Sequence, residues 1–258
     1  MRRFILLMMT AAAVAAGVAF WIRGAPLRRA ARNQSTIDVI RIGDLSAAKA
    51  AVESAVDING GDAYGRTPLM WAVQIADPAI VKKVLDRRAK VNQRDLDHRT
   101  ALMWAAMAGR RDSALLLLDR RADVAAVDLD GTTALMVAAQ TGSLPIAVAL
   151  LEHGAKVDIR RKDGQTALMV AALNGHLEMA RLLMEHGAQV NAVNQSGDSA
   201  LILASDRGHA PVVKVLLEKG ANPAVKNAEG RTAEALALER EHREVLELLR
   251  KARSKQKQ

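Results

Sequence analysis

The side chains of this sequence that could bind a metal ion or respond to an oxidant are methionines and histidines that recur at a fixed interval. There is no cysteine, so a disulfide framework, a thiolate zinc site and a cysteine nucleophile are excluded. Four methionines stand 33 residues apart, namely Met70, Met103, Met136 and Met169. A row of thioethers could act as a soft-metal or oxidation-sensing ladder. Because these positions recur among Leu and Ala at the repeat period, we interpret them as packing residues.

The histidines do not form a metal-binding pattern either. Three of them, His176, His209 and His242, share one position of the same period, and His153 and His186 share another. No two histidines stand four residues apart on a predicted helix with a carboxylate, which is the spacing that a helical zinc site needs. Glycine-rich phosphate loops, nucleophile elbows and paired catalytic acids are also absent from the sequence. We therefore expect no enzyme activity, metal, cofactor or small-molecule substrate.

The elements that carry these residues form a strict internal repeat. A hydroxyl residue recurs every 33 residues without an insertion, at Thr67, Thr100, Thr133, Thr166, Ser199 and Thr232. Each is followed by an apolar run such as Ala134 to Ala138, and each is a natural N-cap for a first helix. A strict period of this length indicates a stacked solenoid.

Later in each repeat the sequence predicts a second helix and an extended finger. Apolar pairs four residues apart, such as Val212-Val213 and Leu216-Leu217, give the second helix one apolar stripe. Gly220 follows that stripe at a position that favours left-handed backbone, and turn dipeptides such as Asp163-Gly164 fold the fingers. Neither helix can bury its stripe alone, so neighbouring repeats must stack. The fold class is therefore all-α.

The run from Thr67 through Pro68, Leu69, Met70 and Trp71 to Ala72, with its copies, resembles the T-P-L-H-x-A signature of the ankyrin repeat. The resemblance covers residues 36–250 as seven repeats with atypical ends. It implies an ankyrin solenoid of helix-turn-helix repeats with β-hairpin-like fingers. It also implies a non-enzymatic module that binds another protein on the concave surface made by finger tips and first helices.

Carried over by position, that surface includes eight candidate protein-binding residues, namely Tyr64, Arg66, Trp71, Ile75, Leu96, Arg99, Trp104 and Met107. Tyr, Trp and Arg dominate binding hot spots, and here they gather in the first two full repeats. The alternative is that both tryptophans only fill helix packing, as Val137, Val170 and Leu203 do later.

The same two repeats also break the glycine pattern. Arg88, Arg121 and His98 stand where other repeats carry Gly. A side chain held in left-handed backbone costs roughly 1 kcal/mol.

The net charge of +9 comes from the two ends of the chain. Residues 1–35 contain six Arg and residues 250–258 contain five basic residues, both without an acid, which leaves 26 basic and 28 acidic residues between them. A basic face on the folded body would suggest nucleic-acid binding, and we expect none. The basic tail at 251–258 suits either an anionic lipid surface or a solvated helix end.

The N-terminal segment predicts export. The uncharged residues Phe4 to Ile22 follow Arg2 and Arg3 and as a helix would span about 28 Å, close to a hydrocarbon core. Residues 1–22 are thus a signal peptide or one hydrophobic anchor helix, with a linker at 23–35. The favoured setting is bacterial, in the periplasm or anchored in the inner membrane; the cytoplasmic face of a membrane is the other orientation. The alternative function is an accessory or stabilising factor, or an inhibitor, of an envelope enzyme.

Overall fold

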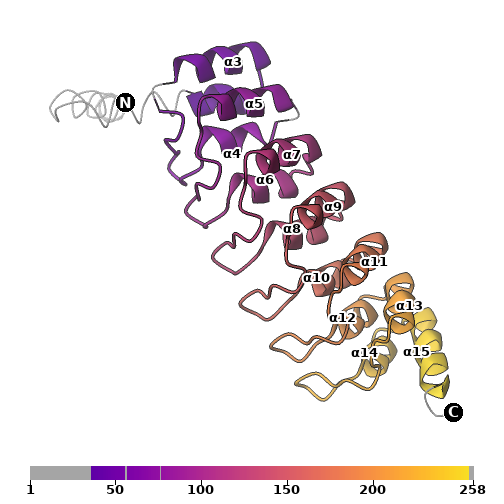
Figure 1. The fold of residues 1–258 in the computed structure, drawn as a ribbon. Coiled ribbons are helices and arrows are strands. Elements are labelled where there is room, and N and C mark those ends of the chain that lie inside the picture. The colour runs from indigo at the N-terminus through magenta and orange to yellow at the C-terminus, as the bar shows by residue number, and fades with distance from the viewer. Residues whose placement is uncertain (1–35, 56, 76, 256–258) are drawn as a thin grey trace, which may run out of the picture. The chain divides into compact units, whose positions relative to one another are not determined.

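The computed structural model describes residues 36–55, 57–75 and 77–255 (Figure 1). The hydrophobic helix predicted over Phe4 to Ile22, and the linker after it, lie outside these residues. Within the described ranges, no helix combines the length and the apolar character needed to cross a bilayer. The chain divides into two compact units, Met1–Leu96 and Asp97–Gln258, which we call unit 1 and unit 2.

Unit 1 is helical where it is not finger loop. Residues 36–42 form a helical turn. The helices after it are α3 (Leu45–Ser54), α4 (Pro68–Ala72) and α5 (Pro78–Asp86). The core between them is aliphatic: Ile37, Ile40, Val52, Leu69 and Val84 are each at most 1% exposed.

Unit 2 alternates short first helices with second helices, as the repeat predicts. The first helices are α6 (Ala101–Met107), α8 (Ala134–Thr141), α10 (Ala167–Leu173), α12 (Ala200–Asp206) and α14 (Ala233–Glu239). The second helices are α7 (Arg111–Asp119), α9 (Leu144–Glu152), α11 (Leu177–Glu185), α13 (Ala210–Glu218) and α15 (Arg243–Lys255). Each first helix packs on the first helix of the next repeat, and each second helix on the next second helix, so unit 2 has two helical layers.

The hydroxyl that opens each first helix is its N-cap, which confirms the prediction. Thr133 Oγ1 accepts the amide of Met136 at 3.2 Å, and Thr166 Oγ1 accepts that of Met169 at 3.4 Å. The methionines at this position are buried, Met136 at 2% and Met169 at 1% exposure. Their role is packing between repeats.

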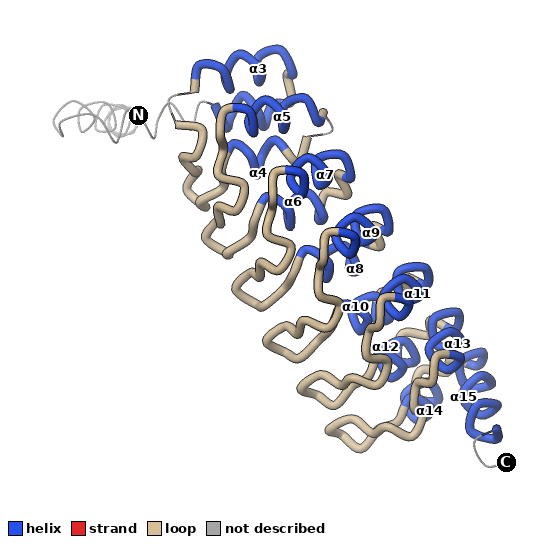
Figure 2. Tube along the Cα trace, in the orientation of Figure 1, coloured by secondary structure: helices blue, strands red, loops and turns tan. Residues whose placement is uncertain are grey.

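The fingers are hairpin-like loops, and no strand forms within the described residues (Figure 2). Isolated antiparallel bridges close three of them, such as that between Val127 and Thr133. Successive fingers are joined at their tips by one backbone hydrogen bond each: the amide of Lys162 donates to the Asp130 carbonyl at 2.8 Å, and that of Gln195 to the Asp163 carbonyl at 2.9 Å. The β-hairpin-like fingers of the prediction are confirmed.

Histidines join neighbouring repeats of unit 2, a role that sequence reasoning did not assign. His209 Nε2 is 3.1 Å from the carbonyl oxygen of Leu173, at the end of the preceding first helix. The ring lies over Gly175, where an added Cβ would stand 2.6 Å from it. His176 and His242 repeat this contact in their own repeats. Each histidine therefore satisfies a helix-terminal carbonyl that would otherwise be left unpaired.

Four residues other than glycine have a positive φ: Arg88 at 59°, His98 at 63°, Arg121 at 61° and Glu241 at 58°. The first three confirm the prediction from the glycine phase. Glu241 was not predicted, although it stands 33 residues after Gly208 and the same phase could have identified it.

Candidate functional site

Asp62 organises the candidate surface of unit 1, because its carboxylate serves four donors. Its Oδ1 accepts the amides of Tyr64 at 2.8 Å and Arg66 at 2.9 Å, which closes the finger turn. Its Oδ2 accepts the indole N–H of Trp71 at 3.1 Å and lies 3.6 Å from Arg66 Nε. The Asp62 side chain is only 9% exposed, so one buried charge fixes the finger to the first helix α4.

Arg66 lies between two aromatic rings. Its guanidinium carbon is 4.6 Å from the centroid of the Tyr64 ring and 4.7 Å from that of Trp71. A second guanidinium, that of Arg41, lies 5.2 Å from the Trp71 ring. Cation–π contacts of this kind hold long side chains in place before any partner arrives. We call Arg41, Asp62, Tyr64, Arg66 and Trp71 the aromatic cluster.

The aromatic cluster is bordered by exposed apolar side chains. Tyr64 is 63% exposed and Leu96 is 66% exposed, and the Leu96 amide donates to the Tyr64 carbonyl at 3.0 Å. Ile75, just after α4, is half-buried. Ile42, which the sequence did not single out, is 79% exposed. Unit 1 thus combines a fixed polar centre with an apolar border, the composition of a binding hot spot.

The remaining three candidates belong to unit 2. The Arg99 guanidinium carbon is 5.6 Å from the centroid of the Trp104 ring, and Arg99 pairs with Asp97 at 3.3 Å. Met107 ends α6 with 43% of its surface exposed. This is a second arginine–tryptophan pair, and it is built in the same way as the pair in unit 1.

Both tryptophans are half-buried, whereas Val137 and Val170, at the same repeat position, are 6% and 5% exposed. Filling the helix packing therefore accounts for only part of each tryptophan ring. The protein-binding role of the eight residues stays a prediction.

Sequence reasoning missed Asp62 and Arg41. Asp62 could have been found, because it begins a series of Asp or Asn spaced by the repeat period, as in Asp128 and Asn227. Arg41 lies in the atypical first repeat, and only the fold brings it to Trp71.

The C-terminal repeats of unit 2 contain a polar groove of about 420 Å³ between fingers and first helices. Its charged side chains pair with one another: Arg240 contacts Asp206 at 3.2 Å, Arg231 contacts Glu239 at 3.2 Å, and Arg231 also pairs with Glu229. The groove therefore carries both signs of charge in neutralised pairs.

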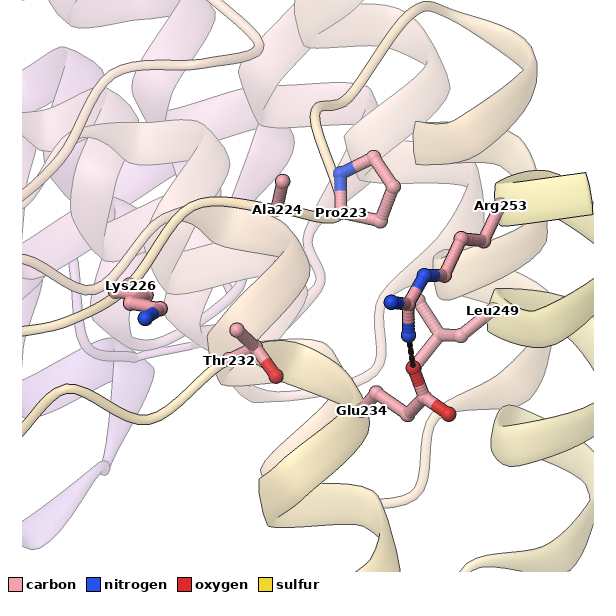
Figure 3. Close-up of a pocket in the computed structure, with 7 residues that line it drawn as sticks. All are labelled: Pro223, Ala224, Lys226, Thr232, Glu234, Leu249 and Arg253. Atoms are coloured by element: carbon pink, nitrogen blue, oxygen red, sulfur yellow. Dashed lines mark hydrogen bonds and ion pairs between the residues drawn. The ribbon is translucent and has the colours of Figure 1, made fainter. Parts of the chain in front are cut away.

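A smaller cavity of about 240 Å³ lies beside α15 (Figure 3). Glu234 faces it and accepts from Arg253 at 3.3 Å and Arg250 at 3.4 Å (Figure 3). Thr232 on the same wall caps α14 by accepting the Ala235 amide at 3.2 Å. These polar groups stabilise the last repeat. In the described part of the chain, no three His, Asp or Glu gather as a metal site would require.

Comparison with known proteins identifies the class. The family profile described as ankyrin repeats (3 copies) matches residues 36–128, 122–194 and 189–258. The crystal structure of the ankyrin repeat domain of Bcl-3, described as a unique member of the IkappaB protein family, is similar with a TM-score of 0.69 and 32% identity. That match covers 83% of this chain and 97% of the Bcl-3 chain. The search of curated proteins gives no match.

The chain therefore belongs to the ankyrin-repeat family, as its period predicted. Ankyrin repeats indicate a module of protein–protein interaction.

Proposed function

We propose that this protein binds another protein through the aromatic cluster of unit 1 and its apolar border. The observation that carries the proposal is the position of Arg66, 4.6 Å and 4.7 Å from two aromatic centroids, beside a Tyr64 that is 63% exposed. Ordering such side chains on binding costs roughly 0.5–1.5 kcal/mol each. Here the fold has already ordered them, so a partner gains more from the contact.

The partner's contribution follows from the chemistry of the surface. Tyr64 and Leu96 offer apolar area, while the Trp71 N–H is already bonded to Asp62. An apolar side chain of the partner can cover the Tyr64 ring and Leu96 without leaving a buried donor unpaired. Arg99, Trp104 and Met107 of unit 2 are the further candidates for the same role.

The test is site-specific photo-crosslinking in cells that produce the protein. A photoreactive residue at Tyr64 should capture one defined protein. The same residue at Lys82, an exposed position on the second helix α5, should not. The captured protein, once purified, should bind the Tyr64→Ala variant at least about tenfold more weakly, as hot-spot residues do. Equal capture from both positions would contradict the proposal.

We further propose that the protein is exported and is held at a bacterial inner membrane by Phe4 to Ile22 or released by cleavage after it. The support is the uncharged run behind Arg2 and Arg3. Fractionation of a tagged full-length protein tests export. N-terminal sequencing of the mature protein then separates an anchor from a cleaved signal, and recovery in the cytosolic fraction alone would contradict both.

A further inference from the structure

The finger of residues 156–165 in unit 2 departs from a rule that other fingers keep. An Asp or Asn oxygen closes the turn by accepting backbone amides within the finger. Asp128 Oδ1 accepts the amides of Asp130 at 2.9 Å and Thr132 at 2.8 Å. The same position is filled by Asp62, Asn194 and Asn227, each with such a bond.

Arg161 occupies this position in the finger of residues 156–165 and has no acceptor to offer. The turn still forms, because the Arg161 amide donates to the Gln165 carbonyl at 2.9 Å and Asp163 Oδ1 accepts the Gln165 amide at 3.0 Å. The Arg161 Nε is buried with no hydrogen-bond partner. The finger therefore forgoes a turn bond and buries a donor, and nothing in the packing compensates. Places where a local rule is broken in this way are candidates for function.

Arg161 stands in a run of three basic residues, Arg160, Arg161 and Lys162. Arg161 pairs with Asp163 at 3.2 Å, whereas Arg160 donates only to neutral carbonyls, that of Val193 at 2.7 Å and that of Gly164 at 3.5 Å. Among the residues that the structure describes, Lys162 has no ion-pair partner. The finger therefore presents positive charge that its neighbours do not neutralise.

The neighbouring fingers show which way a ligand would run. The preceding finger carries Asp128 and Asp130, which repel a negatively charged ligand. The following finger, 189–198, has one acid, Asp198, whose Oδ1 accepts the Asn227 side-chain amide at 3.0 Å. An acidic ligand is thus directed from Arg160 toward the following finger, across which Arg160 already reaches.

We propose that Arg160, Arg161 and Lys162 form a second contact surface, which binds a carboxylate-rich segment of a partner protein. Guanidinium groups pair with carboxylates through two parallel hydrogen bonds. The charges stand on three successive residues, so they match a row of carboxylates along an extended chain. A single phosphate would need donors that converge on one point. This surface is separate in chemistry from the aromatic cluster and goes beyond the function proposed above.

The experiment uses the full-length protein and a fluorescent oligoglutamate peptide, with binding followed by anisotropy at low and high salt. The double variant Arg160→Gln with Lys162→Gln should bind the peptide about tenfold more weakly. A matched variant, Lys214→Gln with Lys251→Gln, removes the same charge from exposed positions on α13 and α15 and should bind as the parent does. Equal loss in both variants would mean non-specific attraction and would overturn the proposal.

Arg161→Asn gives the sharpest result, because it separates stability from binding. Asn restores the turn acceptor, so the melting temperature should rise while peptide affinity falls by about threefold. A rise in melting temperature with unchanged affinity would overturn the proposal.

Two further arms test the choice of ligand and the independence of the surface. Inorganic phosphate and vesicles containing phosphatidylserine should bind no more weakly to the double variant than to the parent; loss confined to either of them would overturn the proposal. Tyr64→Ala should leave peptide binding unchanged. If Tyr64→Ala abolished it, the aromatic cluster would be the peptide site and this proposal would fail while the first one stood.

Discussion

The finger and first helix of residues 57–72 can be compared with the regular repeats of unit 2, since both descend from one 33-residue template. In unit 2, a histidine such as His209 bonds the end of the preceding first helix and lies over a glycine. In unit 1, a buried carboxylate, Asp62, and an arginine stacked on two rings hold the finger to the helix.

The difference teaches how one template is divided between stability and display. The histidine contacts of unit 2 lie between repeats, and they use small, mostly buried groups. The aromatic cluster of unit 1 keeps large side chains at the surface, with Tyr64 63% exposed. Exposed aromatic area contributes little to folding, so its retention is consistent with binding.

The largest effect that would sharpen this comparison is expected from Asp62→Ala. The variant loses two turn bonds and leaves the Trp71 N–H and the Arg66 charge without their acceptor, which should cost about 3 kcal/mol of unfolding free energy. The matched change in unit 2, Asp128→Ala, removes only the two turn bonds and should cost about 1–2 kcal/mol. Urea denaturation measures both, and equal losses would show that the link from Asp62 to Trp71 contributes nothing.

Arg87→Ala tests how unit 1 holds its atypical first helix pair. The Arg87 guanidinium donates to the carbonyls of Val52 at 2.6 Å and Ala55 at 2.9 Å, and also to that of Glu53, at the end of α3. Removing these bonds should lower the stability of α3 by about 1–2 kcal/mol and speed its amide exchange. Lys219→Ala, at the same repeat position in unit 2, is the control and should change little. Unaltered exchange in α3 would contradict this role.

Arg88→Gly exploits the left-handed backbone. Arg88 has φ of 59°, so glycine should relieve strain and raise stability by about 1 kcal/mol. The reciprocal change in unit 2, Gly187→Ala, places a side chain at φ of 85° with no atom within 4 Å of the added Cβ. It should lower stability by a similar amount, and thermal unfolding of both variants checks the pair. Changes of the same sign would refute the strain explanation.

The smallest effect concerns the ion pair between Glu53 and Lys83 in unit 1. The hydrogen bond from Lys83, then its charge and that of Arg87, hold the pKa of Glu53 below its ordinary 4.5, against a small opposing effect of burial. Because the folded pKa is the lower one, the pair stabilises the fold fully above pH 4.5, and this contribution is lost as the pH falls through the folded pKa. Lys83→Met should make the acid decline of stability shallower in a pH series. Superimposable profiles would show no contribution from the pair.

Much of the fold could be predicted because each element has a local cause. The hydroxyl caps such as Thr133, the left-handed positions such as Arg88 and the buried methionines all follow from residue type and phase. The candidate residues Tyr64, Arg66 and Trp71 were identified by position, and the structure brings these three together. Their supporting groups were not identified, because Asp62 acts through a side-chain contact nine residues along the chain and Arg41 through the fold.

The sequence by itself determined the period, the alternation of two helices with a finger, and the faces that each helix buries. These depend on local propensity and on a spacing that repeats without insertion. Only the tertiary structure decided that Asp62 serves four donors, that Arg66 lies between two rings, and that each Gly-turn histidine bonds the preceding repeat. Distances between side chains are set by how helices and fingers pack, and residue spacing alone does not fix that packing.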